Sequence, residues 1–92
     1  MTTPSGVLDR GWDLDPLVSV RPESFGALLY HFGTRRLSFL KDPRLLDVVQ
    51  RLPASTTARD ACLAAGLTEA ELPSYDRALG TLVSTEMLRE RA

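Results

Sequence analysis

The pattern of apolar and polar positions divides the chain into an irregular start, a β-rich middle and a helical end. In the first 14 residues the apolar side chains follow neither the period of a helix nor that of a strand. We therefore predict that residues 1–14 form a flexible N-terminal tail and that residues 15–92 form the folded domain. Trp12 stands among polar neighbours in this tail, and two interpretations stay open: it packs against the domain, or it contacts a partner.

The segment after the tail has the composition of β-strands. Residues 17–21 are rich in β-branched side chains and are followed by turn residues, which predicts a first strand. Two longer apolar runs, 25–32 and 35–40, are separated only by Gly33 and Thr34. A two-residue loop that begins with glycine is typical of a type II′ turn, so the two runs are predicted to pair as an antiparallel hairpin.

This hairpin implies a register that the side chains can test, because each face of the sheet receives its own set of cross-strand pairs. One face carries Tyr30 opposite Leu37 and Leu28 opposite Phe39, and the other carries His31 opposite Arg36, Leu29 opposite Ser38 and Ala27 opposite Leu40. The first set is the more apolar and is predicted to face the core. The same turn directs the backbone groups of Arg36, Ser38 and Leu40 away from the hairpin.

Three helices are predicted in the second half of the chain. Asp42 and Pro43 are a favoured cap and a favoured first residue, and Pro53 ends the helix that they begin. The buried stripe of this helix consists of Leu45, Val48, Val49 and Leu52. A second, Ala-rich helix begins after a threonine cap and ends at Gly66.

The third helix has a composite start. Thr68 and Glu71 have the spacing of a capping box, and Pro73 is unfavourable inside a helix. We therefore predict one loose turn over residues 68–72 and a main helix from Pro73 towards Met87. The order of elements, three antiparallel strands followed by three helices (βββααα), predicts an α+β, winged-helix-like fold.

Composition and charge narrow the classes of function. Ninety-two residues can build a single domain, and 11 basic against 12 acidic side chains give a net charge of −1, which disfavours nucleic acid as a partner. One cysteine and one histidine predict neither a disulfide nor a metal site. No apolar run approaches the roughly 20 residues of a membrane span, so we expect a cytoplasmic protein that does not bind a membrane.

No constellation of catalytic residues is evident, so the chain is predicted not to be an enzyme and to hold no cofactor. Cys62 lies in the Ala-rich helix and fits a small core side chain better than a nucleophile. His31 is predicted to be solvated, or to make a polar contact with Arg36 across the hairpin. The glycines are scattered and form no phosphate-binding loop.

Positive charge is concentrated at one place in the chain. Arg35, Arg36, Lys41 and Arg44 lie within ten positions, opposed only by Asp42. Two interpretations stay open. These charges protect an edge strand from self-association, or they mark a docking edge for an acidic, extended peptide that pairs with the backbone.

Residues 20–27 (VRPESFGA), 30–33 (YHFG) and 35–40 (RRLSFL) closely resemble the corresponding segments of the peptide chaperones of mycofactocin biosynthesis, within the PqqD-like family of RiPP recognition elements. The resemblance covers about residues 14–89. It implies a non-catalytic protein that binds the leader of a ribosomally made precursor peptide as an added strand and presents it to a radical SAM maturase. The iron–sulfur clusters and S-adenosylmethionine would belong to that enzyme.

The resemblance also implies the residues of the site. The leader would pair with the third strand, beside the third helix. By position, the peptide-binding residues are Arg35, Arg36, Leu37, Ser38, Phe39 and Leu40 on the strand and Tyr75, Leu79, Leu82 and Val83 on the helix.

Two other functions remain as alternatives. The last two helices resemble a helix-turn-helix, which would make the chain a winged-helix DNA-binding regulator, although the charged residues between 68 and 82 are three acids and one arginine. A free strand edge could instead serve a structural dimerisation module, so we expect a monomer or a weak dimer.

Overall fold

The computed structural model describes residues 5–91, which form an α+β fold around a three-stranded antiparallel sheet. The strands of this sheet are β2 (Val18–Glu23), β3 (Gly26–His31) and β4 (Leu37–Leu40), in the spatial order β2-β3-β4. A two-stranded ribbon joins β1 (Trp12–Leu14) to β5 (Leu88–Glu90). The helices are α1 (Ser5–Leu8), α2 (Pro43–Arg51), α3 (Ala58–Ala64) and α4 (Leu72–Ser84), with 3-10 turns η1 (Leu52–Ala54) and η2 (Glu69–Glu71) before α3 and α4. The predicted fold class is confirmed.

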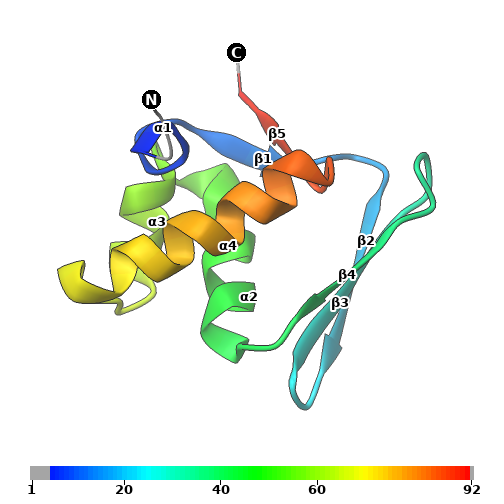
Figure 1. Cartoon of the computed structure of the whole chain (residues 1–92), viewed down its shortest axis with the longest axis horizontal. Coiled ribbons are helices and arrows are strands. Elements are labelled where there is room, and N and C mark those ends of the chain that lie inside the picture. The colour runs from blue at the N-terminus through cyan, green and yellow to red at the C-terminus, as the bar shows by residue number, and fades with distance from the viewer. Residues whose placement is uncertain (1–4, 92) are drawn as a thin grey trace.

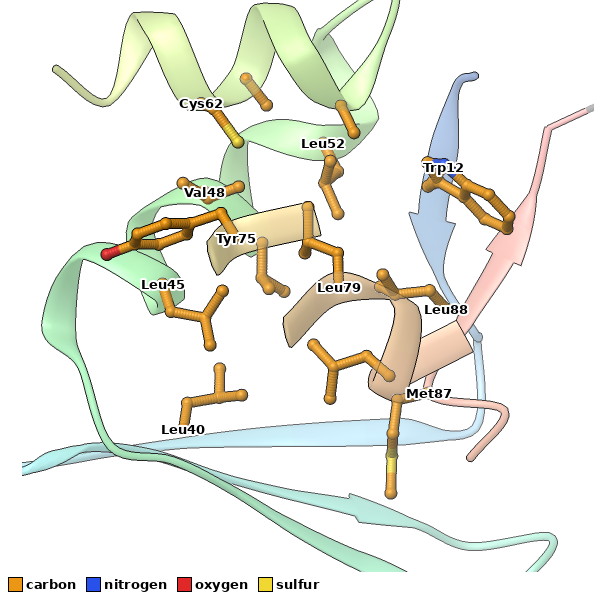
Figure 2. Packing of buried hydrophobic residues seen from close by; sticks show 14 of the residues in the cluster. Trp12, Leu40, Leu45, Val48, Leu52, Cys62, Tyr75, Leu79, Met87 and Leu88 are labelled. Carbon is orange, nitrogen blue, oxygen red and sulfur yellow. The ribbon is translucent and has the colours of Figure 1, made fainter. Parts of the chain in front are cut away.

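All the helices lie on one side of the three-stranded sheet, and its other side faces solvent (Figure 1). The core fills the space between the inner face of the sheet and the helices. Leu40 points from β4 towards Leu45 of α2, with Leu79 of α4 behind them and Met87 beside the sheet (Figure 2). None of the helices within residues 5–91 is both long and apolar enough to cross a membrane.

The predicted register is confirmed, but the prediction of the core face is wrong. Tyr30 pairs with Leu37 and Leu28 with Phe39, as expected. The buried side chains of the hairpin, however, are Ala27, Leu29, His31 and Leu40, whereas Leu37 and Phe39 are exposed. The face that carries Leu28, Tyr30, Leu37 and Phe39 is therefore the outer face of the sheet.

The turn explains this inversion, because it is not a two-residue type II′ loop. The N–H of His31 donates to the carbonyl oxygen of Arg36 at 3.0 Å, so these two residues close the hairpin and a four-residue loop, 32–35, lies between them. Arg35 adopts the left-handed conformation (φ 64°), and Gly33 does not. His31 is buried, and its Nδ1 accepts hydrogen bonds from the N–H groups of Gly33 (3.0 Å) and Thr34 (3.1 Å), which corrects its predicted solvated position.

The helices begin and end close to where the sequence predicts. Asp42 caps α2 by accepting a hydrogen bond from the N–H of Arg44 at 2.9 Å, and Thr57 caps α3 through the N–H of Asp60 at 3.2 Å. Gly66 follows α3 with a φ of +92°, as expected for the residue after a helix. The loose turn before the third helix is η2, with the capping box of Thr68 and its N3 glutamate in place.

The N-terminal segment differs from the predicted tail. Residues 1–4 lie outside the described part of the chain, but residues 5–14 form α1 and β1, and β1 pairs with β5. Trp12 is buried and donates from Nε1 to the carbonyl oxygen of Val7 at 2.8 Å, which confirms that it packs against the domain. Two three-residue strands are too short to produce a periodic pattern, so the sequence did not indicate this ribbon.

Arg91 ties the ribbon to the helical half. Its backbone N–H donates to the carbonyl oxygen of Gly11 at 3.0 Å. Its guanidinium reaches Oδ1 of Asp13 and the carbonyl oxygens of Leu52 and Pro53, each at 3.1 Å, and also the carbonyl oxygen of Ser55. The side chain thus supplies donors to carbonyl groups that follow α2.

A glycine fixes the place where β4 leaves the sheet. Gly26, the first residue of β3, has a φ of +146°, and a Cβ atom there would lie 2.0 Å from the carbonyl oxygen of Leu40 and 3.0 Å from the backbone nitrogen of Asp42. Neither neighbour is the flexible end of a side chain, so the backbone itself would have to shift.

We expect Gly26→Ala to lower the free energy of unfolding by at least about 2 kcal/mol, through strain in the backbone and the clash with Leu40. Gly80→Ala is the matched control, because a Cβ at Gly80 in α4 meets nothing within 4 Å. This control should gain roughly 0.5–1 kcal/mol through its greater helix propensity. Denaturant unfolding of both variants tests the prediction, and equal stabilities would contradict it.

Asp76 on α4 is buried, and its Oδ1 has no hydrogen-bond partner within residues 5–91. Burial raises the pKa of this carboxyl, and this effect outweighs the attraction of Arg59 and Arg77. The folded state therefore favours the protonated form, and ionisation at neutral pH destabilises the fold.

We expect Asp76→Asn to raise the free energy of unfolding at pH 7 by about 1 kcal/mol, since it removes a desolvated charge. The gain should shrink as the pH falls through the raised pKa of Asp76, because the parent carboxyl then becomes neutral as well. Asp60→Asn, on the exposed side of α3, is the control and should show no such gain. A pH-independent difference between Asp76→Asn and the parent would rule out this explanation.

Candidate functional site

The free edge of β4 is the first element of the site. β4 is the last strand in the order β2-β3-β4, and no other strand within residues 5–91 pairs with it. His31 bonds to Arg36 on the β4 side, and Phe32 donates to the carbonyl oxygen of Leu17 at 2.9 Å on the β2 side. Backbone groups of successive strand residues point to alternate sides, so this pair of bonds sets the pattern for the whole of β3.

The same alternation decides which groups of β4 are free. Ser38 and Leu40 occupy the same side as Arg36 and bond to β3, whereas the N–H and C=O groups of Leu37 and Phe39 point to the open edge. The prediction that Arg36, Ser38 and Leu40 offer the free backbone groups is therefore wrong. The error has the same origin as the inverted face, since it assumed that a two-residue loop closes the hairpin.

A pocket of about 270 Å³ lies where β4 ends and α2 begins. Its lining residues are Lys41, Asp42, Leu45, Ser74, Tyr75 and Ala78. Ser74 and Ala78 lie one helical turn apart on α4, and their small side chains leave the space that the pocket occupies. The pocket is thus bounded by the continuation of β4 on one side and by α4 on the other.

A set of polar contacts fixes the shape of the pocket. The Tyr75 hydroxyl donates to Oδ2 of Asp42, and the Arg44 guanidinium lies 2.9 Å from Oε2 of Glu71 and 5.9 Å from the centre of the Tyr75 ring. The hydroxyl lowers the pKa of Asp42, while burial and the neighbouring carboxylate raise the pKa of Tyr75 to about 12. At neutral pH the phenol therefore remains a donor and Asp42 an ionised acceptor.

Positive charge along β4 remains uncompensated. Within residues 5–91, Arg35, Arg36 and Lys41 make no ion pair, and all three are exposed. Arg44 differs from them, because it is paired with Glu71. The free charges at both ends of β4 are therefore cationic, and Asp42, which follows Lys41 in the chain, already accepts two hydrogen bonds.

The structure separates the helix residues that the sequence singled out. Tyr75 lines the pocket, whereas Leu79 and Leu82 are buried in the core and Val83 packs against it half-buried. Sequence reasoning missed Ser74 and Ala78 as pocket residues. The signal that could have found them is the pair of small residues one turn apart beside an aromatic side chain.

The chemistry of the chain suits binding more than reaction. Cys62 is buried and burial raises the pKa of its thiol to about 11, so it is not a nucleophile at neutral pH. Across residues 5–91 no three His, Cys, Asp or Glu side chains come together as a metal site. An open strand edge, a pocket and unpaired cations are features that recognise an extended peptide.

Comparison with known proteins gives a consistent result. The model of the peptide chaperone MftB family matches residues 11–89. Peptide chaperone MftB of Mycobacterium tuberculosis is 53% identical over 83 residues, which cover 90% of this chain and 76% of that protein. The proteins of the same name from Mycobacterium ulcerans and Mycolicibacterium smegmatis are 54% and 51% identical over 80 residues, which cover 87% of this chain and 73% and 78% of theirs.

No solved structure matches this chain. The matched residues include all of the three-stranded sheet, the pocket and the β1–β5 ribbon up to Arg89. The family resemblance noted from the sequence is confirmed, and so is the expectation of a protein that is not an enzyme, since a peptide chaperone is non-catalytic. The chain belongs to the peptide chaperone MftB family.

Proposed function

We propose that this protein is a non-catalytic chaperone of mycofactocin biosynthesis that binds the leader of the precursor peptide and delivers it to a radical SAM maturase. The observation that carries the proposal is the open edge of β4, with the backbone groups of Leu37 and Phe39 unpaired and the pocket at its end. The leader would add to the sheet as a fourth strand beside β4.

Backbone pairing alone would bind the leader weakly. The four free N–H and C=O groups of Leu37 and Phe39 contribute about 0.5–1.5 kcal/mol each, or roughly 2–6 kcal/mol together. Micromolar binding requires about 8 kcal/mol. The remainder must come from side chains of the leader, and the pocket beyond Leu40 is placed to accept one of them.

The pocket favours an apolar side chain next to an acidic one. Leu45, Ala78 and the ring of Tyr75 supply apolar walls, while Lys41 stands at the border without an ion-pair partner in the described chain. Arg35 and Arg36 flank the other end of the strand. An acidic leader would meet complementary charge at both ends of β4, which speeds encounter.

The DNA-binding alternative finds no support in the comparisons, because the similar proteins are peptide chaperones. A cytoplasmic location and a monomeric or weakly dimeric state remain predictions from the sequence. The first is consistent with the lack of a membrane-spanning helix within residues 5–91.

We expect Leu37→Pro to weaken leader binding about three- to ten-fold relative to Leu37→Ala. Both variants lose the leucine side chain, but only proline removes the N–H that points to the open edge, and the first residue of a strand tolerates proline. Calorimetric titration with a synthetic leader peptide measures the difference. Equal affinities in two folded variants would exclude pairing at the β4 edge.

Ser38→Pro provides the contrast for this experiment. Its N–H points to β3, so this substitution should break the hairpin and lower stability in addition to binding. A variant that kept its stability would contradict the hydrogen-bond pattern described above.

We expect Arg36→Glu to weaken binding of an acidic leader about five-fold at low salt, with the loss shrinking as salt is added, because exposed charges are screened beyond roughly 10 Å at 0.1 M salt. Arg89→Glu on β5 makes the same change in net charge away from the site and is the matched control. Titrations at two salt concentrations compare the variants. Equal losses in both would point to net charge instead of a local contact.

A further inference from the structure

The outer face of the three-stranded sheet is apolar over β3, over β4 and over the loops beside them. Its apolar members come from β3, from β4, from the two loops that join the strands and from the residue before β2, whereas β2 itself contributes Ser19, Arg21 and Glu23. The apolar members are Leu17, Phe25, Leu28, Tyr30, Phe32, Leu37 and Phe39. No helix within residues 5–91 covers this face, since all of them pack on the opposite side (Figure 1).

We call the apolar side chains on this face the outer apolar face, and two aromatic pairs lie within it. The rings of Phe25 and Phe39 lie 6.4 Å apart, and Tyr30 meets Phe32 edge-on at 4.9 Å. Leu17 borders Phe32, to which it is hydrogen-bonded through the backbone. Even so, Phe32 is 62% exposed, Phe39 59% and Leu37 54%, so these side chains are not covered.

A surface of this kind is unusual on a small antiparallel sheet. Such sheets normally alternate apolar residues towards the core with polar residues towards water. Here the exposed apolar side chains offer on the order of 500 Å², at the upper end of what soluble monomers show outside functional surfaces. The β3 and β4 residues on the outer face are of the kinds that usually occur on a buried face. For this reason the sequence pattern alone assigned the outer face to the core.

The leader peptide does not account for the outer apolar face. A strand added beside β4 contacts Leu37 and Phe39 directly, but neighbouring strands lie about 4.8 Å apart, so Phe32 and Leu17 remain one and two strands further away. Only a partner with a broad surface can also cover Leu17, Phe25 and Phe32.

A second copy of this chain fits the surface poorly. Arg35 and Arg36 follow Phe32 closely in the chain and make no ion pair within the described residues, so two apposed copies would bring like charges together. A partner with an apolar centre and an acidic rim would instead complement both features.

We propose that the outer apolar face is the docking surface for the maturase, which covers Leu17, Phe32 and their neighbours with an apolar patch rimmed by acidic side chains. This inference rests on the proposed function. Under this proposal the two partners bind at different places. The edge of β4 holds the leader, and the outer apolar face of the sheet holds the enzyme. The leader is thereby presented at the border of the docked surface.

The test uses the double variant Leu17→Ser/Phe32→Ser of the full chain, because both side chains are exposed and lie away from the β4 edge. Leu63→Ser is the matched control, since Leu63 is a 42% exposed leucine on α3. Each protein is titrated by calorimetry with the purified radical SAM maturase and, separately, with the synthetic leader peptide. Thermal unfolding confirms that each variant is folded.

We expect the double variant to bind the maturase at least ten-fold more weakly and the leader within two-fold of the parent, while Leu63→Ser changes neither. Unchanged maturase affinity in the double variant would overturn the docking surface, and so would a parent that does not bind the maturase. The leader titration would then still test leader binding on its own. A parent that does not bind the leader would overturn the proposed function itself. A parent dimer that the double variant converts to a monomer would assign the face to a second copy and refute the inference.

Discussion

The open edge and the outer face of the sheet both depend on the alternation of its middle strand, β3. In a β-strand, a residue whose side chain points to one face also directs its backbone groups to one side, and the next residue reverses both. The bond from His31 to Arg36 therefore fixes two properties of β4 together. Leu37 and Phe39 show their side chains to solvent and their backbone groups to the open edge, while Leu40 enters the core.

Much of the fold follows from the sequence, but the parity of β4, that is, which of its residues face solvent and the open edge, does not. The register, the Asp42 cap and the turn before α4 are local patterns, and the structure contains all of them. The parity depends on the hairpin loop, where Gly33 and Thr34 imitate a two-residue turn. In the structure the loop is longer, because the buried His31 imidazole accepts the N–H groups of both residues and Arg35 supplies the left-handed conformation.

The site shows the same division between local and non-local information. The basic segment and the edge strand could be predicted, because they lie within a short stretch of sequence. The pocket could not, since it needs the start of α2 to meet the start of α4, which the Tyr75–Asp42 contact joins across 33 positions. Hydrophobic periodicity identified Leu79 and Leu82 correctly as apolar helix residues, but it does not distinguish a core wall from a groove wall.

The β1–β5 ribbon has a consequence for the time at which this domain is completed in the cell. Asp13 meets Arg91 across 78 positions, so β1 is made early and its partner strand is made late. A ribosome that adds about 5–20 residues per second leaves Trp12 without its partner strand for several seconds while the sheet and helices are synthesised. Closure of the ribbon is therefore a late step of biosynthesis, and until then the nascent domain exposes an indole and an unpaired strand that the finished protein conceals.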